Sequence, residues 1–303
     1  MKALVFGGSG FLGSYVADQL SESGHEVTIF DLKTSPYLKK NQKMIVGNIV
    51  DQEKVSSAIA KQDVVFNFAG IADIDFARHN PYETLHTNYV GNLNILNACV
   101  ANKVKRYLFA STLYVYSSLG SFYRASKQSC ELTIEAFAEK LDFKYTILRY
   151  GSLYGPRAHQ TNWISKILHQ ALREKKITRC GDGDEIREYI HVTDAARLSV
   201  KAIGKEFENE YVIISGNQSI RIKDLMVMIK EMFNNTVNLE FSESTNDTHY
   251  EITPYNFRPK LAKKIDDSSH IDLGQGVLDL IYSIAQENHN LDSDLRQILK
   301  SPQ

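Results

Sequence analysis

A glycine-rich turn close to the N-terminus is the feature that most constrains the fold of this chain. Residues 2–6 are a short apolar run, the sequence Gly-Gly-Ser-Gly-Phe-Leu-Gly follows at 7–13, and apolar residues then recur at helical spacing. This order predicts a strand, a tight turn and a helix whose first free N–H groups face an anion such as a pyrophosphate. The residues predicted to surround that anion are Gly7, Gly10, Phe11, Leu12 and Gly13. A purely structural turn has a similar sequence, so the interpretation depends on the residues that follow.

A carboxylate ends the second predicted strand, residues 25–30. It belongs to Asp31, which lies about 20 residues beyond the glycines, as in dinucleotide-binding units. A carboxylate at this position accepts hydrogen bonds from both ribose hydroxyls of an adenosine and repels a 2′-phosphate. The sequence therefore predicts NAD as the cofactor, lying along Asp31 and Leu32. NADP is the alternative, because Lys33 is nearby.

Strands and helices alternate along the first half of the chain. Further strands are predicted at residues 44–47, 64–68 and 106–111, with helical patterns between them. This alternation implies an α/β fold with a doubly wound parallel sheet, helices on both faces, and a ligand at the carboxyl ends of the strands. Residues that follow these strands are further cofactor candidates: Asn48, Ile49, Phe68, Ala69 and Gly70. Asn48 either contacts an adenine edge or is a simple turn residue.

Two helix starts carry capping signals. Asp51 is predicted to cap the helix that follows the third strand. Asn80 precedes Pro81 and Glu83, an order that predicts a capped start with proline at the first helical position and a capping-box glutamate.

Composition indicates an ordinary soluble protein. Apolar residues make up 43% of the chain and the net charge is −1, so no nucleic-acid partner is implied. The cysteines, at 99, 130 and 180, lack metal-ligand spacing, and no metal is expected. The start of the chain lacks a signal-sequence pattern and no segment reaches the ~20 apolar residues of a membrane span, so we expect a cytoplasmic protein.

Tyr123 and Lys127 form the predicted reaction centre. They lie four residues apart at the start of a helical pattern, so their side chains share one helix face about one turn apart. A free tyrosine titrates at about pH 10, and a nearby cation favours its phenolate form. Ser111 and Thr112 bring two hydroxyl groups to the end of the preceding strand. The alternative is that Tyr123 packs at a helix start and Lys127 is an ordinary solvated residue.

Motifs along most of the chain have the residues and spacing of one known family. They are Gly-Gly-Ser-Gly-Phe-Leu-Gly at 7–13, Asp31, Asn-Tyr-Val-Gly-Asn-Leu-Asn at 88–94, Ser-Thr-Leu-Tyr-Val-Tyr at 111–116, Tyr-Arg-Ala-Ser-Lys at 123–127, Leu-Arg-Tyr at 148–150, Tyr-Gly-Pro-Arg at 154–157, Gly-Asp-Gly at 181–183 and Arg-Glu-Tyr-Ile-His-Val-Thr-Asp at 187–194. In these the chain resembles the extended short-chain dehydrogenases/reductases, a group that includes NAD-dependent epimerases and dehydratases acting on nucleotide sugars.

The resemblance implies a Rossmann fold and assigns roles to particular residues. Tyr123 is expected to be the acid/base, Lys127 to bind the nicotinamide ribose and tune Tyr123, and Thr112 to orient the reacting hydroxyl. Ser111 is a further catalytic candidate. Asn88 and Tyr150 are expected next to the cofactor. Members usually dimerise through two helices per subunit, so a homodimer through the helices after residues 80 and 123 is expected; their apolar content fits core packing equally well.

The second half of the chain is expected to bind the substrate, a nucleotide-diphosphate sugar. Residues 1–150 would form the NAD-binding domain, with 186–204 returning to it, and residues 151–303 mainly the substrate-binding region. Arg187 and Arg258 are the candidates for the substrate diphosphate, because guanidinium groups grip phosphate oxygens in a bidentate way. Ser152 lies close to the position at which relatives usually carry an asparagine that contacts the substrate phosphates. Residues 211–215, 222–233 and 237–241 are expected to form a small α/β lobe beside the cleft.

Departures from the family pattern narrow the expected reaction. Dehydratases of this family carry Thr-Asp-Glu, whereas here Leu113 and Tyr114 follow Thr112, which disfavours a 4,6-dehydratase. The stretch 111–127 also lacks the cysteine and histidine of C3/C5 epimerases. What remains is hydride transfer at one carbinol, expected at C4 of the sugar, by a 4-epimerase or a net dehydrogenase or ketoreductase.

The connection between Tyr116 and Tyr123 is shorter than in relatives, which predicts a roomier pocket for a bulkier sugar, a heptose or a modified hexose. A different class of function is also considered, a catalytically silent NAD-binding sensor or scaffold. That hypothesis predicts loss of the acid/base pair, and both Tyr123 and Lys127 are present.

Overall fold

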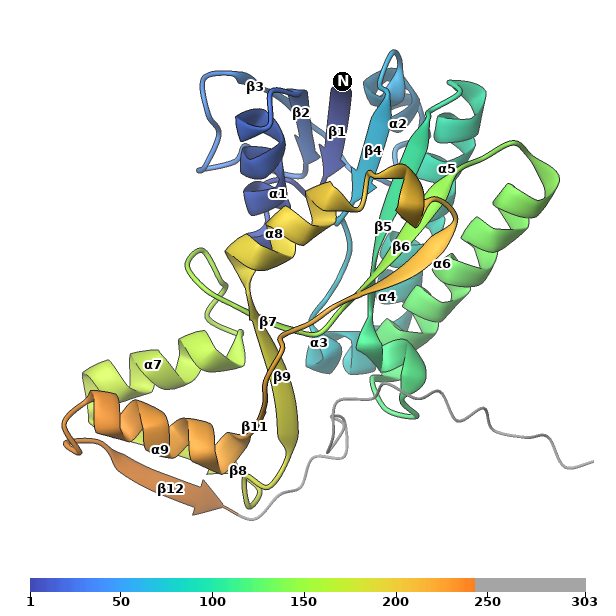
Figure 1. Cartoon of the computed structure of the whole chain (residues 1–303). Coiled ribbons are helices and arrows are strands. Elements are labelled where there is room, and N and C mark those ends of the chain that lie inside the picture. The colour runs from blue at the N-terminus through green and yellow to red at the C-terminus, as the bar shows by residue number, and fades with distance from the viewer. Residues whose placement is uncertain (243–303) are drawn as a thin grey trace, which may run out of the picture. The chain divides into compact units, whose positions relative to one another are not determined.

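A parallel sheet of seven strands forms the centre of residues 1–242, which are the residues that the computed structural model describes (Figure 1). Its strand order is β10-β6-β5-β4-β1-β2-β3, and each neighbouring pair is parallel. The strands are β1 (Lys2–Phe6), β2 (Glu26–Asp31), β3 (Gln42–Val46), β4 (Val64–Asn67), β5 (Arg106–Thr112), β6 (Tyr145–Tyr150) and β10 (Glu210–Ile214). The order of β3 to β6 around β1 is that of a Rossmann fold, which confirms the predicted fold class.

Helices cover both faces of this sheet, as Figure 1 shows. One face packs on α1 (Phe11–Glu22) and α8 (Val192–Lys201), and the other on α2 (Gln52–Ile59), α5 (Gly91–Ala101) and α6 (Ser121–Lys140). Strand alternation divides the side chains of β1 between two cores: Leu4 and Phe6 face the second set of helices, whereas Ala3 and Val5 face the first. Helices cover both faces of β4, which is why all of its residues are buried, including the polar Asn67.

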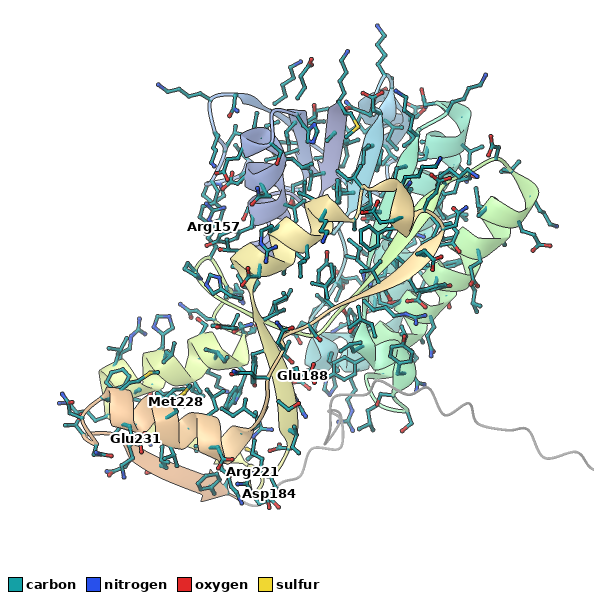
Figure 2. All side chains as sticks on the ribbon, viewed as in Figure 1. Arg157, Asp184, Glu188, Arg221, Met228 and Glu231 are labelled. Atoms are coloured by element: carbon teal, nitrogen blue, oxygen red, sulfur yellow. The ribbon has the colours of Figure 1, made fainter. Side chains whose placement is uncertain are left out.

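A smaller part of the structure is built around a third core. It contains a three-stranded sheet of β7 (Ser152–Tyr154), β9 (Ile186–His191) and β11 (Ser219–Arg221), and a parallel pair of β8 (Lys176–Cys180) and β12 (Asn238–Ser242). Helices α7 (Trp163–Glu174) and α9 (Ile222–Met232) bury their apolar faces in this core. Glu188 on β9 (Figure 2) accepts hydrogen bonds from Ser215 at 3.0 Å and Ser219 at 3.1 Å, which ties β9 to the segment between β10 and β11.

Residues 211–215 do not belong to this smaller part, contrary to our expectation. Glu210–Ile214 is β10, which pairs with β6 at the edge of the main sheet. The error arises because an apolar run shows that a strand forms but does not show which strand it pairs with. The preceding helix, α8, packs on α1, and this brings the chain back to the main sheet.

The two predicted helix caps differ in outcome. Asp51 caps α2 as expected, accepting a hydrogen bond from the Lys54 N–H. The Asn80 side chain instead donates to the Phe76 carbonyl at the end of the short helix α3 (Ile74–His79), so the predicted capping box before α4 (Pro81–Leu85) is wrong. Asn80 lies between the two helices, and its side chain satisfies a free carbonyl at the end of the first one, α3. A π-helical segment, His86–Val90, then connects α4 to α5.

None of the helices within residues 1–242 combines the length and apolarity needed to cross a membrane.

A buried ion pair joins α6 to the middle of the sheet. Glu131 on α6 accepts hydrogen bonds from Arg149 on β6 at 3.0 and 2.7 Å, in a bidentate arrangement. The Arg149 guanidinium lies between the rings of Tyr116 and Tyr211, 4.6 and 4.2 Å from their centroids. Burial lowers the pKa of Arg149, but hydrogen bonding and charge from Glu131 and Tyr116 together outweigh this effect and raise the pKa, so this residue remains a cation.

The substitution Glu131→Gln tests the importance of this pair. It keeps the side-chain shape but leaves Arg149 as an uncompensated buried cation, and we expect it to lower the free energy of unfolding by about 3–5 kcal/mol. Urea denaturation measures the change. Glu139→Gln, on the exposed side of the same helix, is the control and should be near neutral. Equal effects of the two substitutions would contradict the prediction.

Candidate active site

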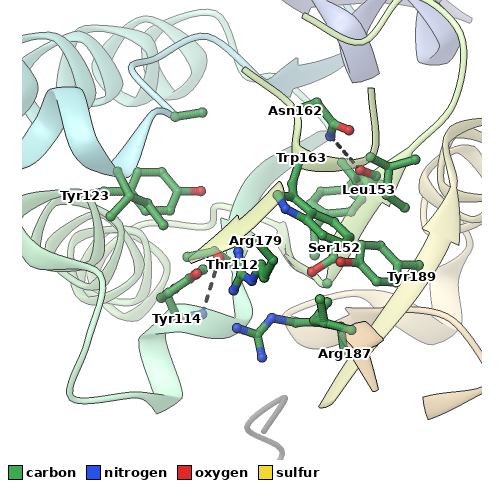
Figure 3. Close-up of a pocket in the computed structure, with 16 residues that line it drawn as sticks. Thr112, Tyr114, Tyr123, Ser152, Leu153, Asn162, Trp163, Arg179, Arg187 and Tyr189 are labelled. Atoms are coloured by element: carbon green, nitrogen blue, oxygen red, sulfur yellow. Dashed lines mark hydrogen bonds between the residues drawn. The ribbon is translucent and has the colours of Figure 1, made fainter. Parts of the chain in front are cut away.

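A cleft of about 330 Å³ opens at the carboxyl ends of β5 and β6 (Figure 3). Its lining comes from these strand ends, from α3 and α6, and from the smaller part of the structure. The lining residues are Ala72, Ile74, Thr112, Tyr114, Tyr123, Tyr150, Gly151, Ser152, Leu153, Asn162, Trp163, Ile164, Arg179, Arg187, Tyr189 and Ile222. The cleft therefore brings together residues from both halves of the chain.

Tyr123 and Lys127 lie one turn apart at the start of α6. Figure 3 shows the Tyr123 hydroxyl pointing into the cleft. The Lys127 Nζ lies 5.9 Å from the centroid of the Tyr123 ring and 4.8 Å from that of Phe109, and it donates a hydrogen bond of 2.8 Å to the Ala110 carbonyl. Only 6% of Lys127 is exposed, and this burial lowers its pKa below the ordinary value. The local i, i+4 spacing thus places a buried amine beside a phenol, as predicted.

Thr112 and Ser111 face opposite sides of β5. Thr112 lines the cleft, and its Oγ1 accepts a hydrogen bond of 3.2 Å from the Tyr114 N–H. The Ser111 hydroxyl instead donates to the Glu131 carboxylate, inside the network that contains the buried ion pair. Ser111 is expected among the catalytic residues, but it does not line the cleft, because successive strand residues point to opposite faces.

The glycine turn brings backbone segments closer together than side chains permit. Gly7 has a φ of +75°, and a Cβ there would lie 2.6 Å from the Ala69 N. A Cβ on Gly13 would lie 2.2 Å from the Gly7 carbonyl oxygen. Helix α1 begins immediately after Gly10, so the N–H groups of the next residues, Phe11 and Leu12, stand at the helix start. This shape fits the phosphates of a dinucleotide.

Asp31 lies at the end of β2, next to this turn. Its carboxylate accepts hydrogen bonds from the Ser9 N–H at 2.9 Å and the Leu32 N–H at 2.7 Å. Leu32 is exposed, with 62% of its surface accessible. Together the glycine turn and Asp31 fit NAD, with Asp31 placed to hold the adenosine ribose.

Asn48 and Ile49 have local structural contacts. The Asn48 Oδ1 accepts a hydrogen bond of 3.1 Å from the Val50 N–H, which is the turn geometry that we considered as the alternative for this residue. Ile49 is buried in the core, and its carbonyl accepts from the Asn94 side chain. The structure gives neither residue a feature that requires a cofactor contact.

Asn88 joins the loop after β4 to helix α6. Its Oδ1 accepts from the Ile71 N–H, and its Nδ2 donates to the Ile71 carbonyl and to the Ser126 hydroxyl. A Cβ on Gly70 would lie 2.7 Å from the Asn88 Oδ1, so the loop approaches this side chain closely. These contacts show how Asn88 positions the loop and α6.

Tyr150 ends β6 and lines the cleft. Its hydroxyl is paired with that of Ser199 on α8 at 2.5 Å, and burial raises its pKa. The ring of Phe68 lies 6.3 Å from the Tyr150 ring, and Ala69 follows with its N–H bonded to the Asn67 side chain. Tyr150 thus offers the cleft an aromatic wall.

Three of the four residues predicted to contact the substrate line the cleft, and Thr112 is one of them. Ser152 lies at the start of β7, and Arg187 on β9 is 7% exposed. Arg258 lies outside the described residues. Prediction missed four conspicuous lining residues, which are Tyr114, Trp163, Arg179 and Tyr189. A signal was available for Trp163, the single tryptophan of the chain, because it follows the helix cap Asn162.

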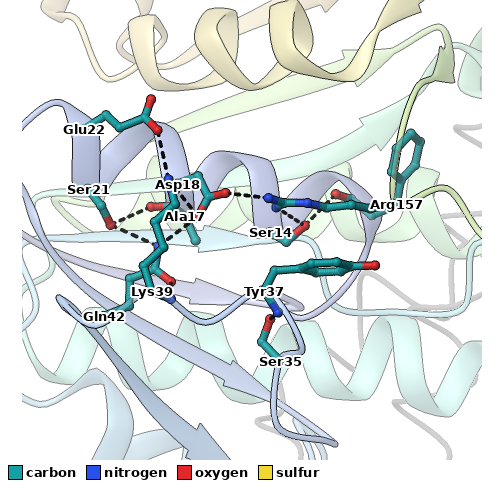
Figure 4. A network of polar contacts seen from close by, with 11 residues as sticks. Ser14, Ala17, Asp18, Ser21, Glu22, Ser35, Tyr37, Lys39, Gln42 and Arg157 are labelled. Carbon is teal, nitrogen blue, oxygen red and sulfur yellow. Dashed lines mark hydrogen bonds and ion pairs between the residues drawn. The ribbon is translucent and has the colours of Figure 1, made fainter.

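A polar network fastens the loop after β7 to helix α1 (Figure 4). Arg157 donates to Asp18 at 2.9 Å and to Ser14 at 3.1 Å. Its guanidinium lies 4.3 Å from the ring centroids of both Tyr15 and Tyr37. The loop that leads to the cleft residues at the start of α7 is therefore anchored on the first helix of the main sheet.

Within residues 1–242, no group of three or more His, Cys, Asp or Glu side chains is placed to hold a metal ion.

Residues 3–214 match the model of the NAD dependent epimerase/dehydratase family, and the chain belongs to this family. This confirms the resemblance stated from the motifs. The protein is accordingly an NAD-dependent enzyme, in agreement with the fit of the glycine turn and Asp31 to that cofactor.

Similar proteins catalyse several reactions. The UDP-N-acetyl-α-D-glucosaminuronate decarboxylase of Bacillus cytotoxicus is 29% identical over 76% of this chain and 80% of its own. The human dTDP-D-glucose 4,6-dehydratase is 25% identical over 87% of each chain. The crystal structure of the UDP-glucose 4-epimerase of Thermotoga maritima with UDP-glucose has a TM-score of 0.79 and 26% identity, covering 85% of this chain and 90% of its own.

The substitution Asp31→Asn tests the choice between NAD and NADP. Asparagine keeps an oxygen acceptor but removes the charge that repels a 2′-phosphate. We expect the ratio of the Kd for NADP to that for NAD to fall about tenfold, since removing one such charge contact is worth one or more kcal/mol. Titration calorimetry measures both constants. Asp142→Asn is the control, because that side chain is 94% exposed. An unchanged ratio would show that Asp31 does not select the cofactor.

Proposed function

We propose that this enzyme transfers a hydride at one carbinol, C4, of a nucleotide-diphosphate sugar, a hexose or a heptose. It acts either as a 4-epimerase or as a net dehydrogenase or ketoreductase. One observation carries the proposal: the ionisable groups among the described lining residues are phenols and guanidinium groups, with Tyr123 beside a buried amine. Similarity to the 4-epimerase of Thermotoga maritima supports C4 as the position.

The residues of the cleft divide the proton chemistry between them. Tyr123, with its hydroxyl in the cleft, takes the proton of the sugar hydroxyl and returns it. The Lys127 ammonium, held by the Ala110 carbonyl, stabilises the negative charge that develops on the phenol oxygen. The Thr112 hydroxyl orients the reacting group. Bound NAD supplies the acceptance and return of hydride.

The two residues after Thr112 favour this chemistry over dehydration. Elimination of water needs an acid and a base in addition to the redox site. Leu113 is buried and apolar, and Tyr114 presents a ring that packs edge-on against Tyr123 at a centroid distance of 6.4 Å. The position next to the catalytic tyrosine is thereby taken by an aromatic side chain, in contrast to the acidic pair of the dehydratases. Tyr114 also lines the cleft in which the short connection between Tyr116 and Tyr123 is expected to leave room for a larger sugar. The larger sugar stays a prediction.

Assays with nucleotide sugars test the proposal. We expect the enzyme to convert at least one UDP- or dTDP-sugar to its C4 epimer or to the corresponding ketone, with product identified by chromatography and NMR. A stoichiometric rise in absorbance at the NADH band would identify a net dehydrogenase. Almost no rise would identify an epimerase. Tyr123→Phe removes the acid/base and should lower kcat about 10²–10⁴-fold.

Tyr89→Phe is the matched control, because its hydroxyl accepts a hydrogen bond from Thr133 away from the cleft. If Tyr123→Phe left every turnover unchanged, the silent NAD-binding sensor or scaffold would replace the proposed enzyme activity.

A second copy of the chain is the proposed protein partner. Large apolar side chains are exposed on neighbouring helices: Tyr82 at 80% on α4, and Leu132 at 67% and Phe122 at 39% on α6. Exposed apolar side chains on helices that pack against each other are candidates for a contact with another protein. These are the helices through which the family resemblance predicts a homodimer.

Leu132→Glu tests this interface. A charge buried between two copies is unfavourable, so we expect the variant to elute as a monomer while the parent elutes as a dimer, measured by light scattering after size exclusion. Leu172→Glu, at an equally exposed position on α7, should leave the dimer intact. A parent enzyme that is monomeric, or a dimer that survives Leu132→Glu, would contradict the proposal.

A further inference from the structure

A second arginine, Arg179 on β8, lines the cleft together with Arg187 on β9 (Figure 3). Its guanidinium carbon lies 5.5 Å from the ring of Trp163, and Trp163 in turn stacks on Tyr189 with ring planes 21° apart at 6.4 Å. The aromatic pair thus supports one face of the Arg179 guanidinium. An arginine stacked in this way loses little further side-chain entropy when it binds an anion.

Glu185 holds Arg179 from the other end of the β8–β9 connection. The two side chains form an ion pair, and each is 19% exposed. Among the described residues, however, neither the Arg179 Nε nor the Glu185 Oε2 has a hydrogen-bond partner, although both atoms are buried. Buried polar groups are nearly always satisfied, so this ion pair leaves two buried atoms without a hydrogen bond.

We infer that Arg179 is a specificity-determining residue that binds the substrate diphosphate jointly with Arg187. The inference rests on the proposed function, because it requires a nucleotide-diphosphate substrate. Each phosphoryl group of such a substrate carries a negative charge, and the cleft offers one guanidinium for each. Relatives carry a phosphate-binding asparagine at the place of Gly151 and Ser152, and these two residues bring no charge to the cleft. Arg179 supplies the phosphate contact from another strand.

Binding measurements separate the diphosphate from the rest of the ligand. UDP and UMP, and dTDP and dTMP, differ in one phosphoryl group, so the ratio of the two Kd values isolates its recognition. We expect the NAD-saturated enzyme to prefer the diphosphates, and Arg179→Met to reduce that preference about tenfold or more while Kd for NAD stays unchanged. Arg173→Met, on the exposed side of α7, is the matched control and should leave the ratio as it is.

Glu185→Gln distinguishes diphosphate binding by Arg179 from a purely structural role of Arg179. It retains a hydrogen-bond acceptor for Arg179 but removes a negative charge near the proposed diphosphate site, so it should tighten UDP binding. Weaker UDP binding in this variant, with an unchanged melting temperature, would overturn the inference.

The remaining outcomes separate the two proposals. A wild-type enzyme that binds UDP and dTDP no better than UMP and dTMP would overturn both this inference and the proposed function. A wild-type preference that persists in Arg179→Met would overturn the role of Arg179 alone. If Arg179→Met weakened UDP-glucuronate but neither UDP-glucose nor UDP, the sugar carboxylate would be its ligand and the diphosphate assignment would be wrong.

Discussion

The ion pair between Glu131 and Arg149 is the contact on which the geometry of this site depends. Glu131 lies one turn beyond Lys127 on α6, and its carboxylate engages Arg149 on β6 and Ser111 on β5. With both oxygens engaged, the helix has a single register against the two strands, and Tyr123 meets the strand ends at Thr112. Because desolvation offsets much of the attraction in a buried pair, we expect this pair to define the register of the helix more than it adds net stability.

Parts of the fold that depend on neighbours in the chain were predictable from sequence. The glycine turn, the carboxylate that ends β2 and the Tyr123–Lys127 pair each follow from spacing within a few residues or within one βαβ unit. Strand periodicity likewise predicts which segments are strands. These rules are local, and for that reason they correctly predicted the order of elements and the end of the sheet at which the cleft opens.

Features that depend on distant partners were not predictable in the same way. The strand at residues 210–214 has the apolar pattern of a small-lobe strand, and only its pairing with β6 shows its true place. Asn80 has the sequence of a cap but satisfies the helix before it. Arg179 is an unremarkable cation in sequence, and the aromatic pair and the carboxylate that hold it come from other segments. Ser111 is different, because the alternation of strand side chains would have excluded it beside Thr112.

The cleft has two walls of different chemistry that share one support. Hydroxyl groups come from the ends of the main sheet and α6, with the buried Lys127 amine close to Tyr123, and guanidinium groups come from β8 and β9. Arg157 attaches the loop that leads to Trp163 to helix α1, through Ser14 and Asp18. The start of α1 is also the predicted phosphate-binding site. Cofactor-side and substrate-side groups are therefore positioned from the same helix. The Arg157 guanidinium packs on two tyrosine rings and is paired with Asp18, so the substrate-side loop is attached to the main sheet by both stacking and charge.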